Sequence, residues 1–234
     1  YLHSYPTRRS SDLARLVGEC LHHVPPPQTS GAAPQKKSLH AAERDTPRVQ
    51  QARAHDQRLI TALDPRRLTC VDASGVKLAM TRLYGRAQPG ERVIGTVPQN
   101  YGPNITILGA VGVQGIQAVM TVEGATDTDV FRAYVKHVLG PTLVPGDMVV
   151  LDNLAAHKAR GIQQMLARRR VRLLYLPPYS PDLAPIEPCW SKVKTALRKA
   201  KARTRDALDS AITDAIGTVT AADAHGWFRH CGYA

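Results

Sequence analysis

The sequence predicts an α/β fold in which a mixed β-sheet is covered by helices on both faces. Two observations lead to this prediction. Three strand-like segments come first, the second and third separated by a tight turn, and helices and strands then alternate. A hairpin that leads into alternating units is typical of a mixed sheet with helices on each side. The 234 residues suffice for one such domain with a sizeable core.

Three antiparallel strands are expected at 68–73, 104–113 and 116–124. The first, LTCVDA, is a short apolar run that ends next to an acid. The second and third flank Gln114-Gly115 and therefore predict a hairpin.

A helix is expected at 127–139, with Asp127 or Thr128 as its cap and Gly140-Pro141 as its end. Apolar residues at helical spacing give it one buried stripe. The stripe comprises Val130, Phe131, Tyr134, Val135 and Val138.

The segment MVVLD at 148–152 is continuously apolar, which predicts a strand buried on both faces. The remaining elements alternate as the fold requires. They are a helix at 155–169, a strand at 171–176, helices at 186–201 and 205–217, and a last helix within 224–234.

The N-terminal third is expected to contribute little to the fold. Residues 1–13 begin with Tyr1 and resemble a translated sequencing adaptor, so we expect a non-native tail, with an ordinary disordered tail as the alternative. Residues 14–37 are rich in proline and small polar residues, which predicts a disordered linker or remnant. Residues 38–66 should form a helical lead-in that packs beside the domain at 67–234.

The net charge of +12 and the pI of about 9.9 favour a polyanionic partner such as nucleic acid. A basic surface that serves only solubility is the alternative. No stretch is apolar and long enough to span a membrane and no signal peptide is visible, so a cytoplasmic protein without a membrane partner is expected. The cysteines are too scattered for a zinc knuckle or a disulfide framework, which fits a reducing compartment. They are Cys20, Cys70, Cys189 and Cys231.

Two apolar strands each end in an aspartate, Asp72 and Asp152. Because ligand groups gather at the carboxyl ends of neighbouring strands, these carboxylates should lie side by side. Their repulsion calls for a cation, and oxygen ligands select Mg²⁺ or Mn²⁺ rather than zinc. A third carboxylate would complete a site for two ions. The alternative for each aspartate is a turn or capping role.

The third acid is expected to be Glu187. It is the last residue of the proline-rich segment LPPYSPDLAPIE at 176–187. The prolines of this segment forbid a helix or a strand, so the segment should deliver Glu187 into the first turn of the next helix. The 34 residues between Asp152 and Glu187 leave room for one helix, one strand and this segment.

The helix expected at 186–201 should carry a basic row next to its buried stripe. Such a row could neutralise DNA phosphates and position a strand over the acids, while a solvated helix face is the alternative. The buried stripe comprises Ile186, Trp190, Val193 and Leu197, and the row comprises Ser191, Lys194, Arg198 and Lys201.

These motifs resemble bacterial insertion-sequence transposases of the mariner-type DDE superfamily. The resemblance rests on VVLDNLAAHK at 149–158, YLPPYSPDLAPIEPCW at 175–190 and the spacing between their acids. The segments 71–93 and 36–49 are also similar to that family. The similarity therefore extends from about Lys36 to the end of the chain.

The resemblance implies a ribonuclease H-like fold, two Mg²⁺ or Mn²⁺ ions, DNA at the transposon ends and target as the partner, and a homodimer as the active complex. It implies that Asp72, Asp152 and Glu187 are the three catalytic metal ligands. Asn153 and His157 belong to the second motif and are expected to support the site, although His157 could be a surface or helix-start histidine. Lys158 follows them and joins the expected DNA-binding residues.

The sequence also departs from the family pattern. Ala73 stands where an acid is common, and Ala184 replaces a common asparagine, whose loss as a helix cap costs about 0.5–2 kcal/mol. The stretch before Lys36 is too short for the usual helix-turn-helix units. An inactive, truncated DNA-binding remnant is therefore the main alternative to a nuclease and strand transferase. A nuclease of the same fold that acts on branched DNA or RNA hybrids is a third reading.

Overall fold

The computed structural model describes residues 41–233, apart from Tyr101, Pro103 and Ala159. The expectations for 1–13 and 14–37 lie outside these residues. Within the described part of the chain, no helix is both long and apolar enough to cross a bilayer.

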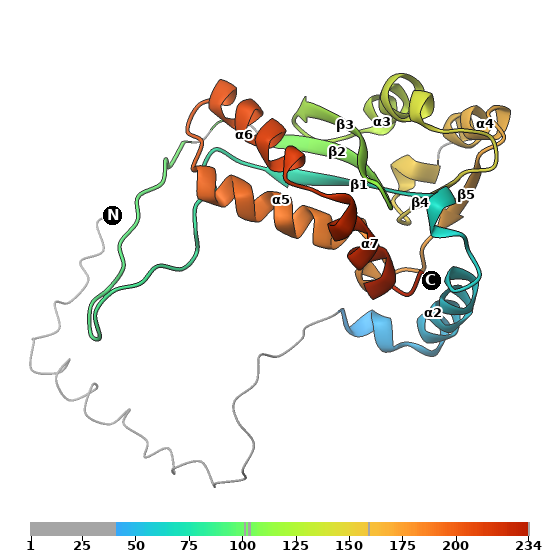
Figure 1. The fold of residues 1–234 in the computed structure, drawn as a ribbon, viewed down its shortest axis with the longest axis horizontal. Helices are drawn as coiled ribbons and strands as arrows, with labels where there is room; N and C mark the ends of the chain where they lie inside the picture. Colours follow the sequence, from blue (N-terminus) through green and yellow to red (C-terminus); the bar gives the residue numbers. More distant parts are fainter. Residues whose placement is uncertain (1–40, 101, 103, 159, 234) are drawn as a thin grey trace, which may run out of the picture. The chain divides into compact units, whose positions relative to one another are not determined.

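One five-stranded sheet organises the fold, in the order β3-β2-β1-β4-β5 (Figure 1). Strand β2 is antiparallel to both of its neighbours, β1 and β3, and β1, β4 and β5 run parallel. The predicted mixed sheet is thereby confirmed. The strands are β1 (Leu68–Val76), β2 (Ile105–Gly112), β3 (Gly115–Glu123), β4 (Met148–Leu151) and β5 (Arg172–Tyr175).

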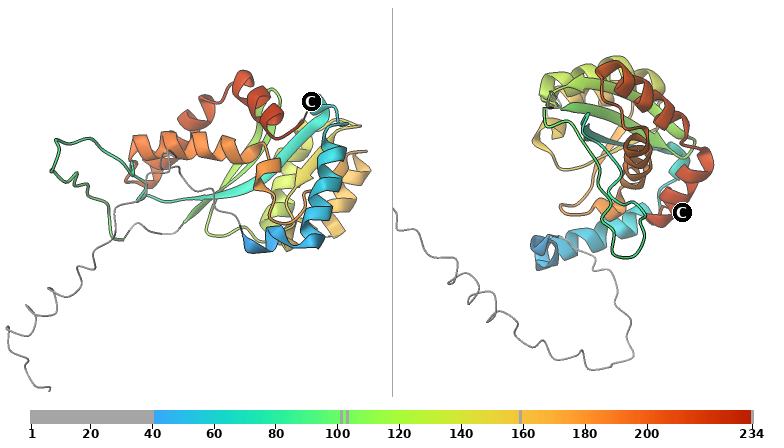
Figure 2. Two further views of the ribbon diagram at one scale, coloured as in Figure 1. Left: turned by 90° about the horizontal axis from the view of Figure 1, so that it is seen from below. Right: turned by 90° about the vertical axis from the view of Figure 1, so that its left-hand side faces the viewer.

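Helices cover both faces of this sheet, as predicted (Figures 1 and 2). One face carries α5 (Ile186–Ala200), α6 (Arg205–Gly217) and α7 (Ala221–His230), drawn in orange and red. The other face carries α3 (Thr128–Tyr134) and α4 (Arg160–Arg168). The helix α2 (Pro47–Ile60) begins at a proline, as expected of the lead-in segment, and belongs to the same compact unit.

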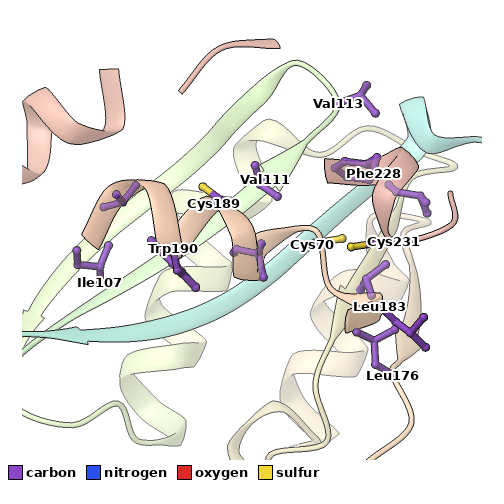
Figure 3. Packing of buried hydrophobic residues seen from close by; sticks show 14 of the residues in the cluster. Cys70, Ile107, Val111, Val113, Leu176, Leu183, Cys189, Trp190, Phe228 and Cys231 are labelled. Carbon is purple, nitrogen blue, oxygen red and sulfur yellow. The ribbon is translucent and has the colours of Figure 1, made fainter. Parts of the chain in front are cut away.

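The two faces arise from alternation along the strands. In β1, Cys70 packs toward the α5 side and Val71 toward the α3 side. In β2, Ile107 and Leu108 divide in the same way. The α5 side is the larger cluster, in which Trp190 lies against the sheet and Phe228 of α7 closes the far end (Figure 3). All four residues of β4 are buried, which confirms the prediction from MVVLD.

Several boundaries differ from the prediction. The hairpin turns at Val113-Gln114, one residue earlier than expected, because Gly115 takes a φ of +112° as β3 begins. The helix expected at 127–139 is capped by Asp127, and its second half is a π-helix. The remaining short helices are η1 (Ala42–Asp45), η2 (Pro65–Arg67), η3 (Val135–Leu139), η4 (Gly140–Thr142), η5 (Ala155–Lys158) and η6 (Pro181–Leu183).

Candidate active site

Strand register places Asp72 beside Asp152. Strand β1 pairs with β4 in parallel, and the last aligned pair is Cys70 with Val150. Two residues further along each strand, the chain reaches Asp72 and Asp152. The prediction that β1 ends at its aspartate is wrong, because pairing with β2 carries the strand on to Val76. Asp72 is therefore held in mid-strand, at the point where β4 has already ended.

Glu187 lies at the same cavity but comes from a later part of the chain. It lies in the first turn of α5, after a proline-rich segment that forms only the short 3-10 helix η6. All three acids line one cavity of about 370 Å³. The structure thus brings together the three carboxylates that the sequence singled out.

The acids also act on one another electrostatically. Burial raises the pKa of Asp72, and the charge of Asp152 raises it further, against hydrogen bonds from the Ala73 backbone and from Trp190. The pKa of Glu187 is raised as well, first by partial burial of its carboxyl group and then by the charge of Asp72, while Lys194 acts in the opposite sense. A cation at this place would relieve both effects.

Asp152 has the opposite shift. Burial alone would raise its pKa, but the hydrogen bond from His157, the backbone N–H of Leu154 and the nearby charge of Lys158 outweigh burial and lower it. His157 Nδ1 lies 2.5 Å from Asp152 Oδ1, and its ring packs on Phe131 with centroids 4.2 Å apart. His157 is only 1% exposed, which excludes the surface alternative. Its hydrogen bond fixes the position of Asp152 Oδ1.

The role of Trp190 was missed by the sequence analysis, which assigned it only to the buried stripe of α5. Its indole Nε1 donates a hydrogen bond of 3.0 Å to Asp72 Oδ2. The ring can lie so close to the sheet because Gly109 is paired with Asp72 and lacks a side chain: a Cβ there would meet the indole at 2.6 Å. A glycine in the middle of an apolar strand is the signal that could have indicated this contact.

Asn153 supports the neighbouring strand end. Its side-chain amide donates to the carbonyl of Leu176, the residue that follows β5. The amide thereby ties the segment after β4 to the start of the proline-rich segment. The supporting role expected for Asn153 stays a prediction.

A second network that the sequence did not reveal holds the proline-rich segment from outside. Arg53 of α2 is 5% exposed and makes a two-bond ion pair with Asp182, at 3.0 and 2.7 Å, while donating to Ser180 at 2.6 Å. The hydroxyl of Tyr233 donates to the Leu183 carbonyl at 2.9 Å. The segment that delivers Glu187 is therefore anchored by α2 and by the C-terminal residues.

The expected helix cap is absent. Helix α5 begins at Ile186 without a side-chain hydrogen bond to its first turn, and the Glu187 N–H donates instead to the Ala184 carbonyl at 3.0 Å. This agrees with the loss of the asparagine that the family pattern would place at Ala184.

The expected DNA-binding residues differ in position. Lys194 is half-buried and close enough to Glu187 to lower its pKa, and Arg198 is half-buried one turn further along α5. Ser191 is exposed, whereas Lys201 lies beyond the last helical residue, in a left-handed conformation with φ of +53°. Exposed Lys158 lies on the Asp152 side, 5.8 Å from the Tyr175 ring centroid. Lys158 therefore lowers the pKa of Asp152, and Lys194 acts in the same sense on Glu187.

The donor set fits a divalent cation with a preference for oxygen, because three carboxylates line the cavity and the thiol that also lines it, Cys70, is buried with a raised pKa that keeps it protonated. Among the described residues, no group of three or more acidic, histidine or cysteine side chains is arranged closely enough to hold a metal ion. Asp152 raises the pKa of Asp72, and both raise the pKa of Glu187, across the cavity that the three acids line.

Comparison with known proteins shows the family of the chain. Residues 67–209 match the family described as DDE superfamily endonuclease. The match covers more than half of the chain, so the chain belongs to this family. A search of curated proteins finds no match to the sequence.

Solved structures of Mos1 transposase share the fold. A paired-end complex with the left transposon end aligns with a TM-score of 0.67 and 15% identity over 99% of this chain and 78% of that chain. The catalytic domain with raltegravir and Mn aligns with a TM-score of 0.64 and 12% identity over 80% and 90%. The catalytic domain of Mos1 mariner transposase aligns at 0.57 and 13% over 86% and 93%. The ribonuclease H-like fold is thus confirmed.

Proposed function

We propose that this chain is a transposase catalytic domain that cleaves DNA strands and joins them to a target by metal-dependent phosphoryl transfer. The observation that carries the proposal is the convergence of Asp72, Asp152 and Glu187 on one cavity in a chain of the DDE superfamily endonuclease family. The Mos1 neighbours include complexes with transposon DNA and structures with Mn or Mg, which supports DNA and divalent ions as the partners.

Asp72, Asp152 and Glu187 would hold two Mg²⁺ or Mn²⁺ ions. When bound, such a pair lowers the pKa of the attacking oxygen and stabilises the leaving oxygen of a phosphodiester. The pKa values of Asp72 and Glu187 are raised, and a bound cation would lower them because it favours the ionised carboxylates.

The other residues of the site have positioning and binding roles. Trp190 and His157 each fix one oxygen of an aspartate through a hydrogen bond. Lys158 lies near Asp152 and Lys194 near Glu187, and both would neutralise DNA phosphates beside the cleaved bond. Asn153 and the anchored proline-rich segment keep the third acid in register with the first two.

The test is nicking of supercoiled plasmid DNA with Mn²⁺ or Mg²⁺. We expect Asp152→Ala to abolish nicking while salt-sensitive DNA binding persists. Asp214→Ala, which removes an exposed acid of α6, serves as the matched control and should nick like the wild type. Full nicking by Asp152→Ala would refute the assignment.

The alternative is a DNA-binding remnant without a competent site. Thermal melting with increasing Mn²⁺ separates the two, because a ligand that binds only the folded state raises the melting temperature. A competent site shows this rise in the wild type and loses it in Asp152→Ala.

Bacterial insertion-sequence origin, a dimeric active complex and action on chromosomal DNA in the cytoplasm belong to the same proposal and rest on the motif resemblance.

A further inference from the structure

One short turn carries two side chains of the candidate site. The 3-10 helix η5 begins soon after Asp152 and includes His157, which hydrogen-bonds to Asp152, and the exposed Lys158. A 3-10 helix of this length makes few hydrogen bonds of its own, and their geometry is poorer than in an α-helix. The position of His157 therefore depends on contacts from outside the turn.

Tyr175 supplies such a contact. It is the last residue of β5 and pairs with Leu151, the residue that precedes Asp152. Its hydroxyl donates a hydrogen bond of 3.0 Å to the backbone carbonyl of His157 and accepts one of 3.3 Å from the side-chain amide of Gln163 in α4. The hydroxyl thus joins β5, the turn η5 and α4 at one point.

Two separate contacts then fix His157. Phe131 packs against its ring, and Tyr175 holds its backbone. The ring contact alone permits sliding of one ring over the other, whereas the backbone contact sets the point from which the side chain starts. Because His157 Nδ1 lies 2.5 Å from Asp152 Oδ1, a shift of the turn would lengthen or break this hydrogen bond. Groups that bind a metal have to be held to within about 0.5 Å of their working geometry.

The ring of Tyr175 contacts the other functional residue of the turn. The ammonium group of Lys158 lies 5.8 Å from the ring centroid, within the range of a cation–π interaction. One side chain thus restrains both His157 and Lys158. If Tyr175 served only to pack beside the sheet, phenylalanine could replace it without any effect on the site, and this difference can be measured.

We propose that Tyr175 is a positioning residue of the candidate active site, whose hydroxyl fixes the turn η5 and, through His157, the orientation of the Asp152 carboxylate for metal binding. Tyr175 does not line the cavity that the three acids share, so it acts through His157. The proposal rests on the proposed function, since it requires divalent ions at the acids.

The first experiment measures Mn²⁺ affinity without DNA, from the electron paramagnetic resonance signal of free Mn²⁺. Tyr175→Phe removes the hydroxyl and keeps the ring, and its Mn²⁺ affinity should fall roughly 10-fold, the lower end of the range for partners that orient metal ligands. Tyr134→Phe is the matched control, because the hydroxyl of buried Tyr134 donates to the Ala118 carbonyl of β3 at 3.4 Å, and it should bind Mn²⁺ like the wild type. Wild-type affinity in Tyr175→Phe would overturn the proposal.

A double-mutant cycle separates positioning from a general loss of packing. In His157→Leu the hydrogen bond to Asp152 is already absent, so the addition of Tyr175→Phe should cause little further loss of Mn²⁺ affinity. If Tyr175→Phe lowers the affinity equally in both backgrounds, the hydroxyl does not act through His157 and the proposal is wrong.

A metal-free measurement distinguishes failure of this proposal from failure of the proposed function. NMR without metal follows hydrogen exchange at the amides of Leu154 and His157, which donate to Asp152 Oδ1 at 3.0 Å and to the Leu154 carbonyl at 3.1 Å. Tyr175→Phe should speed this exchange roughly 2- to 12-fold, as loss of one hydrogen bond does, while Tyr134→Phe should not. Unchanged exchange in Tyr175→Phe would overturn the role of Tyr175 alone. A wild type that binds no Mn²⁺ would instead overturn the proposed function.

Discussion

At the scale of single residues, the hydrogen bond from Trp190 to Asp72 links the core of α5 to the site. Trp190→Phe keeps an aromatic ring in the core but removes the donor to a buried carboxylate, which should cost about 1–3 kcal/mol of stability. Asp72 also loses the partner that fixes its orientation, so Mn²⁺ affinity should fall, as measured by the Mn²⁺-dependent rise in melting temperature.

The second tryptophan provides the control. Trp227→Phe changes a half-buried ring of α7 that packs on the same cluster and should leave Mn²⁺ affinity unchanged. Gly109→Ala should reproduce the metal defect of Trp190→Phe, because its Cβ would displace the indole. Normal Mn²⁺ affinity in both site variants would contradict the positioning role of Trp190.

The raised pKa of Asp72 has a consequence for stability. Its cause is burial, so the folded state binds a proton more tightly than the unfolded state. Ionisation of Asp72 therefore lowers the free energy of unfolding. This loss is absent below the ordinary aspartate pKa of about 3.9 and grows as pH rises to the raised value in the folded state. Without metal, Asp72→Asn should melt above the wild type at pH 7, and the difference should close toward pH 4. A difference that is constant over this pH range would contradict the assignment.

At the scale of elements, the Arg53–Asp182 pair joins α2 to the segment that delivers Glu187. Arg53→Met removes the donor to Ser180 and leaves Asp182 with only its contact to Arg44, which should lower stability by about 1–3 kcal/mol, a range that allows for the 42% exposure of Asp182. The loosened segment should also lower Mn²⁺ affinity. Urea unfolding and Mn²⁺-dependent melting measure the two effects.

A surface ion pair supplies the comparison for this prediction. Arg66 pairs with Asp64 at 3.0 Å but is 80% exposed, so Arg66→Met should change stability little and Mn²⁺ affinity not at all. If Arg53→Met behaves in the same way, α2 does not support the site.

At the scale of the whole molecule, the net charge of +12 should make DNA binding depend strongly on salt. Lys194→Gln and Arg198→Gln should each reduce the slope of log affinity against log salt concentration by about 0.9, the value for one lost phosphate contact on duplex DNA. Lys136→Gln, on the opposite face of the sheet, should leave the slope unchanged. Equal slopes for all variants would mean that α5 makes no phosphate contact with DNA.

Sequence periodicity was sufficient to predict the sheet and its helical cover, because these depend on local patterns of apolar residues. The motifs and their resemblance to a family singled out the three acids, whose catalytic role stays a prediction. It could not predict contacts between residues far apart in the chain. Trp190 and Asp72 are 118 positions apart, and Arg53 and Asp182 are 129 apart. Each of these partners has an ordinary local role, as a core residue, a strand acid or a helix arginine. Only tertiary packing reveals that they support the site.

The pairing of β1 with β4 sets the separation of the first two acids through only three aligned residue pairs. Shifting β4 by one position would move Asp152 by about 3.3 Å and turn it toward the opposite side of the sheet. The alignment of the two backbones at Asp72 and Asp152 can therefore change only in whole steps of the chain, each of which dismantles the site. Glu187 lies outside this pairing, after a separately anchored segment, so its position does not depend on the register between β1 and β4.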